Sequence, residues 1–496
     1  MMRRLLASLS IAAAIALSPA AASAADAPAK DDKEAISLAP MSPDKTIDQS
    51  IQIGRHTIRY KATIGHIDLH DAKGKTIGQV VYAAYIVPGP ATARPVTFAF
   101  NGGPGAASVF LNMGAIGPKR IGFGVAGDSP SDPAVLHDNP GTWLDFTDLV
   151  FIDPVGTGFS RSLVDADESK KDFYGAKPDV EYLSRVIYDW LTRNGRMTSR
   201  KYLVGESYGG YRVPRLAYYL QSQMGVGVSG LVMVSPYLDP PAIGNETNLS
   251  PLPWMIDLPS MAAGNYEREG RALNPATMSE VENYVQTDFV TDFLKGTADK
   301  AATDRLSARV AAYTGLDPAL VRRLDGRVDI ATYLREIRRN TGQVGSVYDS
   351  NVTAYDPFPA SADAHYNDPL LDGIIAPTTS AAVDFITNQV GWKTDAHYET
   401  LSYAVNKAWD RDETDAPVTD LRKAIANDPK MQVMIAHGWD DLSCPYFTSK
   451  LVIDQMPSFG QTERVKLHVY PGGHMFYARR DSSAAFKRDA MAIYGQ

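Results

Sequence analysis

The stretch that decides the fold is Tyr202-Leu203-Val204-Gly205-Glu206-Ser207-Tyr208-Gly209-Gly210, in which a short apolar run leads into a serine flanked by glycines. Residues 205–209 have the pattern Gly-x-Ser-x-Gly, and residues 212–223 have the pattern of a helix. Glycines on both sides of the serine permit a sharp turn that lifts the hydroxyl clear of a sheet. The same pattern occurs in ordinary turns, but its place between strand and helix predicts that Ser207 is a nucleophile.

Short apolar runs of the same kind recur along the chain, and each ends in a loop rich in Gly, Pro, Asp or Ser. They are residues 96–100, 149–152, 202–204, 231–234, 433–436 and 465–470. Helical segments such as residues 180–194 separate several of them, which is typical of a mostly parallel sheet covered on both faces. Residues 56–60 and 80–87, with a turn at 71–74, are predicted to be antiparallel strands at the sheet edge.

Helical periodicity replaces the rhythm of strands after residue 240. It is clearest in residues 278–294, 304–314 and 317–339. We therefore predict an α/β-hydrolase fold, a mostly parallel sheet flanked by helices, with its core in residues 51–240 and 411–496. A mainly helical cap is expected as an insertion at residues 241–410.

The N-terminus has the pattern of a secretory signal peptide over residues 1–24. Arg3 and Arg4 precede an apolar run that is shorter than the ~20 residues of a membrane span, and Ala22-Ser23-Ala24 suits signal peptidase. Residues 25–50 lack apolar periodicity, which predicts a flexible start of the mature chain and order from about Ile51. We expect an exported protein, periplasmic or extracellular, without a membrane span.

The composition argues against a nucleic-acid partner, an intramolecular disulfide and a cysteine-based metal cluster. The chain has 49 Lys and Arg against 57 Asp and Glu, and no basic run that would neutralise the phosphates of a nucleic acid. Cys444 is the one cysteine, so neither an intramolecular disulfide nor a cysteine-based metal cluster can form. Packing of a large core must therefore stabilise the fold, and 44% of the residues are hydrophobic.

A nucleophilic serine needs a base, and in this fold the acid and then the histidine follow the serine along the chain. Three of the later histidines come too early to follow the acid-bearing strand: His365, His397 and His437. His468 lies inside the alternating run 465–470, where a histidine is more often structural. His474 follows Pro471-Gly472-Gly473 in a loop, and we predict it as the base.

The carboxylate that orients the base should come from the loop after strand 433–436. Asp440 and Asp441 both lie in that loop, and spacing alone does not choose between them. Asp420 and Asp428 precede the strand and are predicted to be charges on a helix surface.

An oxyanion hole needs two N–H donors, one from the residue after the nucleophile and one from a loop after an earlier strand. Tyr208 provides the first donor. The second can come from Asn101-Gly102-Gly103-Pro104-Gly105, directly after strand 96–100, because glycines let the backbone approach a substrate closely. A phosphate-binding loop is disfavoured because no Gly-Lys-Ser/Thr sequence follows.

Five motifs together resemble the serine carboxypeptidase family, bacterial branch, over roughly residues 56–480. They are residues 101–105, 151–160 (Phe-Ile-Asp-Pro-Val-Gly-Thr-Gly-Phe-Ser), 205–210, 438–441 (Gly-Trp-Asp-Asp) and 473–475 (Gly-His-Met). The resemblance implies Ser207 as nucleophile, Asp441 as acid and His474 as base. It also implies that the backbone N–H groups of Gly103 and Tyr208 bind the oxyanion.

The same resemblance implies that Asn101, Gly102 and Glu206 bind the terminal carboxylate of a peptide. Eukaryotic members pair this glutamate with a second one in the segment after the glycine-rich loop, and Ala115 stands at that place here. The incomplete pair puts strict C-terminal specificity and an acidic optimum in doubt. Cys444 stands where some relatives have a pocket-lining cysteine, and a small buried apolar residue is an equal alternative.

The resemblance therefore predicts a peptidase that forms an acyl-enzyme and needs neither a metal nor an organic cofactor. Three alternatives share the fold. A proline aminopeptidase has a similar loop that begins with His where this chain has Asn101. An esterase or acyltransferase would combine the same triad with a more apolar pocket. A non-catalytic binding protein of this fold usually has a broken triad, whereas all three members are present here.

Overall fold

The computed structural model describes residues 39–122, 130–131, 133–238, 250–361, 366–411, 417–459 and 464–495. The predicted signal peptide, residues 241–249 at the start of the predicted cap, and His365 lie outside these residues.

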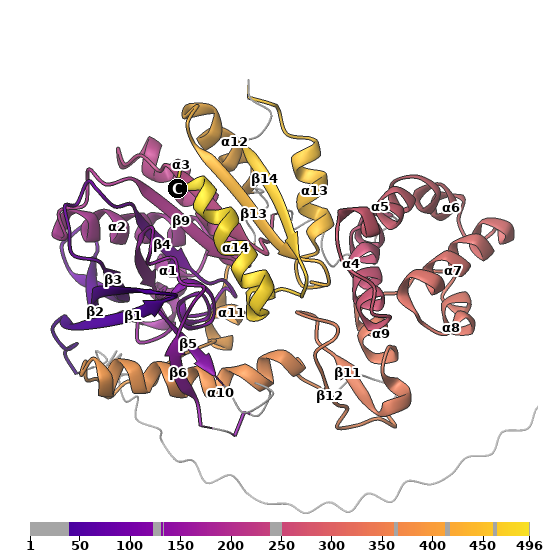
Figure 1. Ribbon diagram of the computed structural model, residues 1–496, viewed down its shortest axis with the longest axis horizontal. Coiled ribbons are helices and arrows are strands. Elements are labelled where there is room, and N and C mark those ends of the chain that lie inside the picture. The colour runs from indigo at the N-terminus through magenta and orange to yellow at the C-terminus, as the bar shows by residue number, and fades with distance from the viewer. Residues whose placement is uncertain are drawn as a thin grey trace, which may run out of the picture. The chain divides into compact units, whose positions relative to one another are not determined.

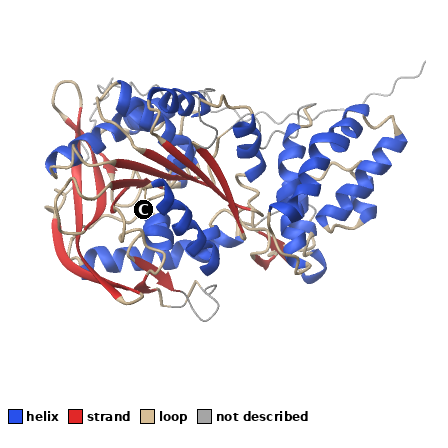
Figure 2. Cartoon of the chain, turned by 45° about the horizontal axis from the view of Figure 1, so that its top comes forward, coloured by secondary structure: helices blue, strands red, loops and turns tan. Residues whose placement is uncertain are grey.

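Within the described residues, a mixed ten-stranded sheet organises the fold (Figures 1 and 2). Its strand order is β1-β2-β3-β7-β4-β9-β10-β13-β14, with β8 paired to β3. Every neighbouring pair from β7 to β14 in this order is parallel, and the pairs that involve β1, β2, β3 or β8 are antiparallel. The strands are β1 Lys45–Ile53, β2 His56–His70, β3 Thr76–Ile86, β4 Val96–Phe100, β7 Asp148–Ile152, β8 Arg161–Ser162, β9 Lys201–Glu206, β10 Gly230–Val234, β13 Gln432–Gly438 and β14 Val465–Tyr470.

Alternate residues of the central strands face two separate hydrophobic cores, as the period of a strand requires. In β4, Phe98 and Phe100 belong to one core and Ala99 to the other. Helices cover both faces (Figure 2). The first core is covered by α1 Ala166–Phe173, α2 Ala176–Arg193, α3 Tyr208–Ser222 and α12 Pro417–Asn427. The second is covered by η1 Leu111–Ile116, α10 Pro369–Asp384, η5 Phe385–Gln389 and α14 Arg480–Ile493.

A group of helices beside the sheet forms a third apolar core (Figure 1). Its helices are α4 Leu252–Arg268, α5 Pro275–Tyr284, η3 Val285–Phe289, α6 Val290–Lys295, α7 Lys300–Thr314, α8 Pro318–Arg323 and α9 Ile330–Glu336. Asp299, Asp317 and Asp329 begin three of them, and each side chain accepts a hydrogen bond from an N–H of the first turn. Helix α13, Tyr446–Asp454, contributes Tyr446 and Phe447 to this core and so joins the cap to the sheet domain.

The cap is shorter than predicted. After η4 Arg339–Thr341 and the hairpin β11 Gln343–Gly345 and β12 Thr353–Tyr355, the chain returns to the sheet through α10, η5 and α11 Tyr403–Ala408. Ala382, Phe385 and Ile386 pack into a core of the sheet domain rather than into that of the cap. The prediction of a cap to residue 410 is therefore wrong for this part, because helical periodicity does not say which core a helix covers.

Helix α10 with η5, Pro369–Gln389, is the one described stretch long and apolar enough to cross a membrane by length and composition. Its mean hydropathy is 1.2, and about a third of it is buried. Its buried residues Ala382, Phe385 and Ile386 pack in a core of the sheet domain.

The N-terminal edge of the sheet also differs from the prediction. Residues 45–50, expected to be flexible, belong to β1, which pairs antiparallel with β2 from Lys45 opposite Ile64 to Ile53 opposite His56. Ile51 is buried and Ile47 is half-buried against the core. The prediction is wrong for these residues because an edge strand gains its stability from pairing with its neighbour, which local composition does not reveal.

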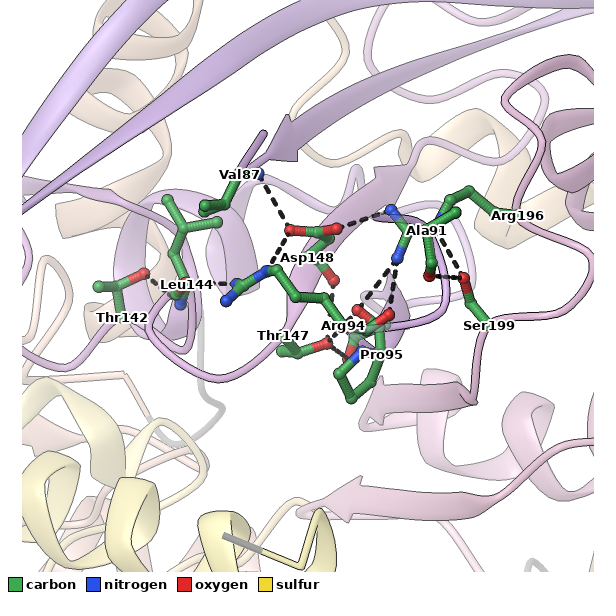
Figure 3. Close-up of polar contacts among 11 residues, drawn as sticks. Val87, Ala91, Arg94, Pro95, Thr142, Leu144, Thr147, Asp148, Arg196 and Ser199 are labelled. Atoms are coloured by element: carbon green, nitrogen blue, oxygen red, sulfur yellow. Dashed lines mark hydrogen bonds and ion pairs between the residues drawn. The ribbon is translucent and has the colours of Figure 1, made fainter. Parts of the chain in front are cut away.

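A buried ion-pair network ties together the amino ends of β4, β7 and β9 (Figure 3). Asp148, the first residue of β7, accepts hydrogen bonds from Arg94 Nε at 3.0 Å, Arg196 Nη1 at 2.6 Å and the Val87 N–H at 3.0 Å. Its side chain lies between the two guanidinium groups in Figure 3 and is 1% exposed. These amino ends lie opposite the strand ends that carry the predicted chemistry.

A separate antiparallel pair of strands, β5 Lys119–Gly122 and β6 Val135–Asp138, lies outside the main sheet.

Candidate active site

Ser207 lies on a strained turn between β9 and α3. Its φ of 59° and ψ of −121° are unusual for a residue other than glycine, and such a conformation costs on the order of 1–3 kcal/mol. The Ser207 N–H donates to the Val234 carbonyl at 2.9 Å. A Cβ added at Gly205 would lie 2.0 Å from the carbonyl oxygen of Gly209, so the turn requires glycine there. The Gly-x-Ser-x-Gly sequence thus forms the sharp strand-to-helix turn that was expected of it.

Asp441 and His474 lie in the loops after β13 and β14. The distance from His474 Nδ1 to Asp441 Oδ2 is 2.8 Å, and both side chains are buried. Asp441 Oδ1 also accepts the N–H groups of Ser443 and Cys444, each at 2.9 Å. Burial lowers the pKa of His474, but the charge and hydrogen bond of Asp441 outweigh burial and raise it overall. Because Nδ1 faces the carboxylate, Nδ1 carries the proton and Nε2 is the nitrogen that can accept one.

The alternative histidine and aspartate have other partners. His468 Nδ1 lies 3.3 Å from Asp489 Oδ2 of α14, and its side chain is 30% exposed. Asp440 Oδ2 accepts hydrogen bonds from Asn351 Nδ2 at 3.1 Å and Ser350 Oγ at 3.4 Å. The structure therefore brings Asp441, not Asp440, to the imidazole of His474.

Residues 346–351, where the chain leaves the cap, contact both the loop that carries Asp441 and the loop that carries His474. The carbonyl of Tyr348 accepts the N–H of His474, and the carbonyl of Val347 accepts the N–H of Leu442 at 3.0 Å. The positions of His474 and of the loop that carries Asp441 thus depend on a segment that belongs to neither strand.

The glycine-rich loop after β4 packs directly against the turn that carries Ser207. A Cβ added at Gly102 would lie 2.4 Å from the backbone nitrogen of Tyr208, so this approach requires glycine. Gly103 has φ of 102°, which also favours glycine. Gly103 and Tyr208, the predicted oxyanion donors, lie in adjoining segments that line the same cavity.

A buried ion pair anchors the start of this loop. Arg212 donates to Asp179 through Nε at 2.5 Å and through Nη2 at 3.2 Å, and its Nη1 donates to the Asn101 carbonyl at 2.8 Å. Both charged side chains are 1% exposed. The Arg212 guanidinium also lies 5.4 Å from the ring centroid of Tyr208. These contacts tie the loop to α2 and α3.

Glu206, the last residue of β9, is a buried carboxyl group that accepts hydrogen bonds from neutral donors. Its Oε2 accepts from Asn101 Nδ2 at 3.0 Å and from the Tyr477 hydroxyl at 2.8 Å. Burial raises the pKa of Glu206 to about 7; the charge of His474 and the two hydrogen bonds act to lower it, and Asp441 acts to raise it. This carboxyl group therefore changes charge near neutral pH.

Tyr477 was not predicted, although it contacts a predicted site residue. It lies in η6, Phe476–Ala478, and its ring would be 3.5 Å from a Cβ added at Gly114. Tyr477 thus packs beside helix η1, which contains Ala115. Ala115 is buried and brings no second carboxyl group to Glu206. No motif marks Tyr477 in the sequence; its closeness to the histidine loop along the chain is the one available signal.

The predicted residues line a cavity of about 420 Å³ at the carboxyl ends of the strands. Ser207, His474 and Glu206 contribute to its wall together with residues 101–104. Much of the remaining wall is aromatic or apolar, and includes Phe110, Tyr211, Tyr237, Tyr348, Leu371 and Trp409. Cys444 is both buried and part of the wall, so each description expected of it applies. Within the described ranges, no group of three or more His, Cys, Asp or Glu side chains is arranged to hold a metal ion.

The fold and this site define the class: an α/β hydrolase whose cavity brings a serine on a strained turn together with an aspartate–histidine pair. Residues 54–251 match the family model described as serine carboxypeptidase, which confirms the family resemblance for the three motifs in this range, at residues 101–105, 151–160 and 205–210.

Curated relatives with serine carboxypeptidase or carboxypeptidase names are similar in sequence, and a solved structure is similar in fold. Serine carboxypeptidase-like 36 of Arabidopsis thaliana is 28% identical over 206 residues, which are 40% of this chain and 39% of the relative. The pheromone-processing carboxypeptidase KEX1 of Ogataea parapolymorpha is 28% identical over 176 residues, 35% of this chain and 25% of the relative. These matches span less than two fifths of the relatives' length. The crystal structure of KEX1(delta)P, a prohormone-processing carboxypeptidase from Saccharomyces cerevisiae, covers 88% of this chain and 91% of its own with a TM-score of 0.55 and 15% identity, which confirms the fold class.

Proposed function

We propose that the protein is an exported serine carboxypeptidase that removes residues from the C-terminus of peptides. The observation that carries this proposal is the place of Glu206, a buried carboxyl group with a pKa raised to about 7, in the wall of the cavity shared by Ser207 and His474. A protonated carboxyl group can donate a hydrogen bond to the terminal carboxylate of a substrate, whereas two anions would repel.

In the proposed acylation step, Ser207 Oγ attacks the carbonyl carbon of the last peptide bond and transfers its proton to His474 Nε2. The Asp441 carboxylate keeps the proton of the imidazole on Nδ1 and stabilises the imidazolium that forms. The N–H groups of Gly103 and Tyr208 bind the developing oxyanion. His474 then gives its proton to the leaving amino group as the C–N bond breaks.

In the deacylation step, water attacks the ester on Ser207 while His474 accepts a proton from the water. Collapse of the second tetrahedral intermediate breaks the ester bond and returns the proton to Ser207 Oγ. These steps use side chains and backbone groups of the chain itself.

The test compares a blocked dipeptide that has a free C-terminal carboxylate with the same dipeptide as an amide. We expect kcat/KM for the free acid to fall as the pH rises through and above about 7, because Glu206 loses the proton that it donates. The amide should lack this decline. Equal handling of acid and amide at every pH from about 4 to 8 would overturn the proposal in favour of an endopeptidase or an esterase.

Two variants assign this pH dependence. Glu206→Gln should abolish the decline for the free acid, because an amide group donates hydrogen bonds without titrating. Asp153→Asn is the matched control: burial raises the pKa of Asp153 to about 7 as well, but this residue does not line the cavity around Ser207. A decline that disappears in Asp153→Asn and persists in Glu206→Gln would contradict the role of Glu206.

Export is part of the same proposal, and it rests on the signal-peptide pattern of residues 1–24. N-terminal sequencing of the protein recovered from outside the cytoplasm should begin at Ala25. A mature chain that retains Arg3 and Arg4 would contradict export by cleavage.

A further inference from the structure

The hydrogen bonds to Glu206 are distributed unequally between its two oxygens. Among the described residues, the Tyr477 hydroxyl at 2.8 Å and Asn101 Nδ2 at 3.0 Å both donate to Oε2. A carboxyl oxygen that accepts two hydrogen bonds is the carbonyl-like oxygen of the protonated group, since the protonated oxygen is the poorer acceptor. The proton of neutral Glu206 therefore belongs on Oε1.

We infer that Tyr477 is a positioning residue that keeps the proton of Glu206 on Oε1, so that the acid presents this O–H to the terminal carboxylate of the substrate. The inference rests on the proposed carboxypeptidase function and adds a residue to it. With Asn101 alone, Oε2 would accept one hydrogen bond instead of two, and the preference of the proton for Oε1 would be weaker. Tyr477 is itself 3% exposed, so its hydroxyl has little water to bind in place of Glu206.

Charged or titratable groups surround Glu206 and Tyr477, and they come from each element that packs against these two side chains. They are His474 and Asp441 of the two loops, the Cys444 thiol, and Arg120 of β5. Arg120 Nη2 donates to the carbonyls of Tyr477 at 3.2 Å and Ala478 at 2.7 Å, which holds the turn that carries the hydroxyl. Tyr477 thus approaches Glu206 from a turn fixed by its own backbone contacts.

The hydrogen bond from Tyr477 has a second consequence, because it also stabilises the carboxylate form of Glu206. This contact acts to lower the pKa of Glu206 against the effect of burial. Removing the hydroxyl should therefore shift the loss of free-acid hydrolysis to higher pH, by about one unit if the bond has the strength usual for a charged acceptor. At low pH, where Glu206 is neutral in both proteins, the variant should hydrolyse the free acid several-fold more slowly, because only Asn101 still favours the proton on Oε1.

The experiment measures the pH profile of kcat/KM for the acid and amide dipeptides in wild type, Tyr477→Phe and Tyr470→Phe. Tyr470 is the matched control, since its hydroxyl also donates to a carboxylate, Asp489 Oδ2 at 2.7 Å, and it does not line the cavity. We expect the upward shift for the acid in Tyr477→Phe only, and no shift for the amide. A purely structural role would instead lower kcat/KM for both substrates by the same factor at every pH.

A second variant tests the inference with the fold preserved. Replacing Tyr477 with 3,5-difluorotyrosine strengthens the hydrogen-bond donor without deleting it, so the loss of free-acid hydrolysis should move to lower pH. Unmoved profiles, or shifts equal to those of Tyr470→Phe, would overturn the assignment of Tyr477. If wild type does not distinguish acid from amide, the proposed function fails; if it distinguishes them and Tyr477 variants do not move the profile, only this inference fails.

Discussion

Strands β4, β7 and β9 begin at one side of the sheet, here called the amino edge, and end at the opposite side, the carboxyl edge. Each of these two edges carries one buried carboxyl group, and the surroundings of the two groups differ. At the amino edge, Asp148 accepts hydrogen bonds from two guanidinium groups and one backbone N–H. At the carboxyl edge, Glu206 accepts hydrogen bonds from an amide and a phenol, both neutral. The two groups are almost equally buried, at 1% and 2% exposure.

The difference lies in whether a cation compensates the buried charge. Arg94 and Arg196 compensate the charge of Asp148, and the resulting network ties loops to the sheet. Glu206 has no guanidinium partner among the described residues, and burial raises its pKa to about 7. A fixed ion pair suits a structural role, whereas a group that gains and loses a proton near neutral pH suits a site that binds an anion.

The largest expected effect concerns the carboxyl edge. Ser207→Ala and His474→Ala should each lower kcat by a factor on the order of 10⁶, because the members of a triad act together. A serine-directed organophosphonate should label Ser207 in the wild type. His468→Ala is the control, since its partner is Asp489, and it should retain turnover. Near wild-type turnover by Ser207→Ala would rule out the serine mechanism.

Asp441, the acid of the proposed triad, should show the next largest effect. Asp441→Asn should lower kcat by a factor of roughly 10⁴, because an amide favours the wrong tautomer of His474. Asp440→Asn should not approach this loss, since Asp440 contacts Asn351 and Ser350 instead. Steady-state kinetics of the two variants settle the order, and a larger loss in Asp440→Asn would reverse the assignment.

The amino edge should respond in stability rather than in catalysis. Asp148→Asn leaves two arginines without their charged partner, and breaking a buried pair in this way typically costs about 3–5 kcal/mol of unfolding free energy. Urea unfolding measures this loss, and the kcat of the folded variant should remain that of wild type. Glu206→Gln should cost much less stability, because a glutamine oxygen still accepts from Asn101 and Tyr477. Similar losses in both variants would remove the contrast between the two edges.

The smallest expected effect is a pH dependence of stability. Between the ordinary pKa of 4.5 and the folded value of about 7, Glu206 binds more protons in the folded than in the unfolded protein. The unfolding free energy must therefore fall as the pH rises through this interval, by up to about 3 kcal/mol for this group. Glu206→Gln should fall less steeply than wild type in urea unfolding at several pH values. Parallel curves would show that Glu206 titrates alike in both states.

Local sequence determined the parts of the molecule that depend on neighbouring residues along the chain. Strands β4 and β14 have the bounds expected from their apolar runs, and the glycines around Ser207 and in residues 101–105 form turns that other residues would block. In such segments the backbone conformation and the alternation of burial are local properties, so the sequence alone was sufficient.

Tertiary structure decided the features that depend on residues far apart in the sequence. Strand β1 exists because β2 pairs with it, and α10 covers the sheet because the chain turns back after the cap. The pairing of Asp441 with His474 spans 33 residues, and the hydroxyl of Tyr477 meets Glu206 across 271 residues. Spacing could not choose the aspartate or reveal the tyrosine, because hydrogen bonds between separate loops are set by how the strands are ordered in the sheet.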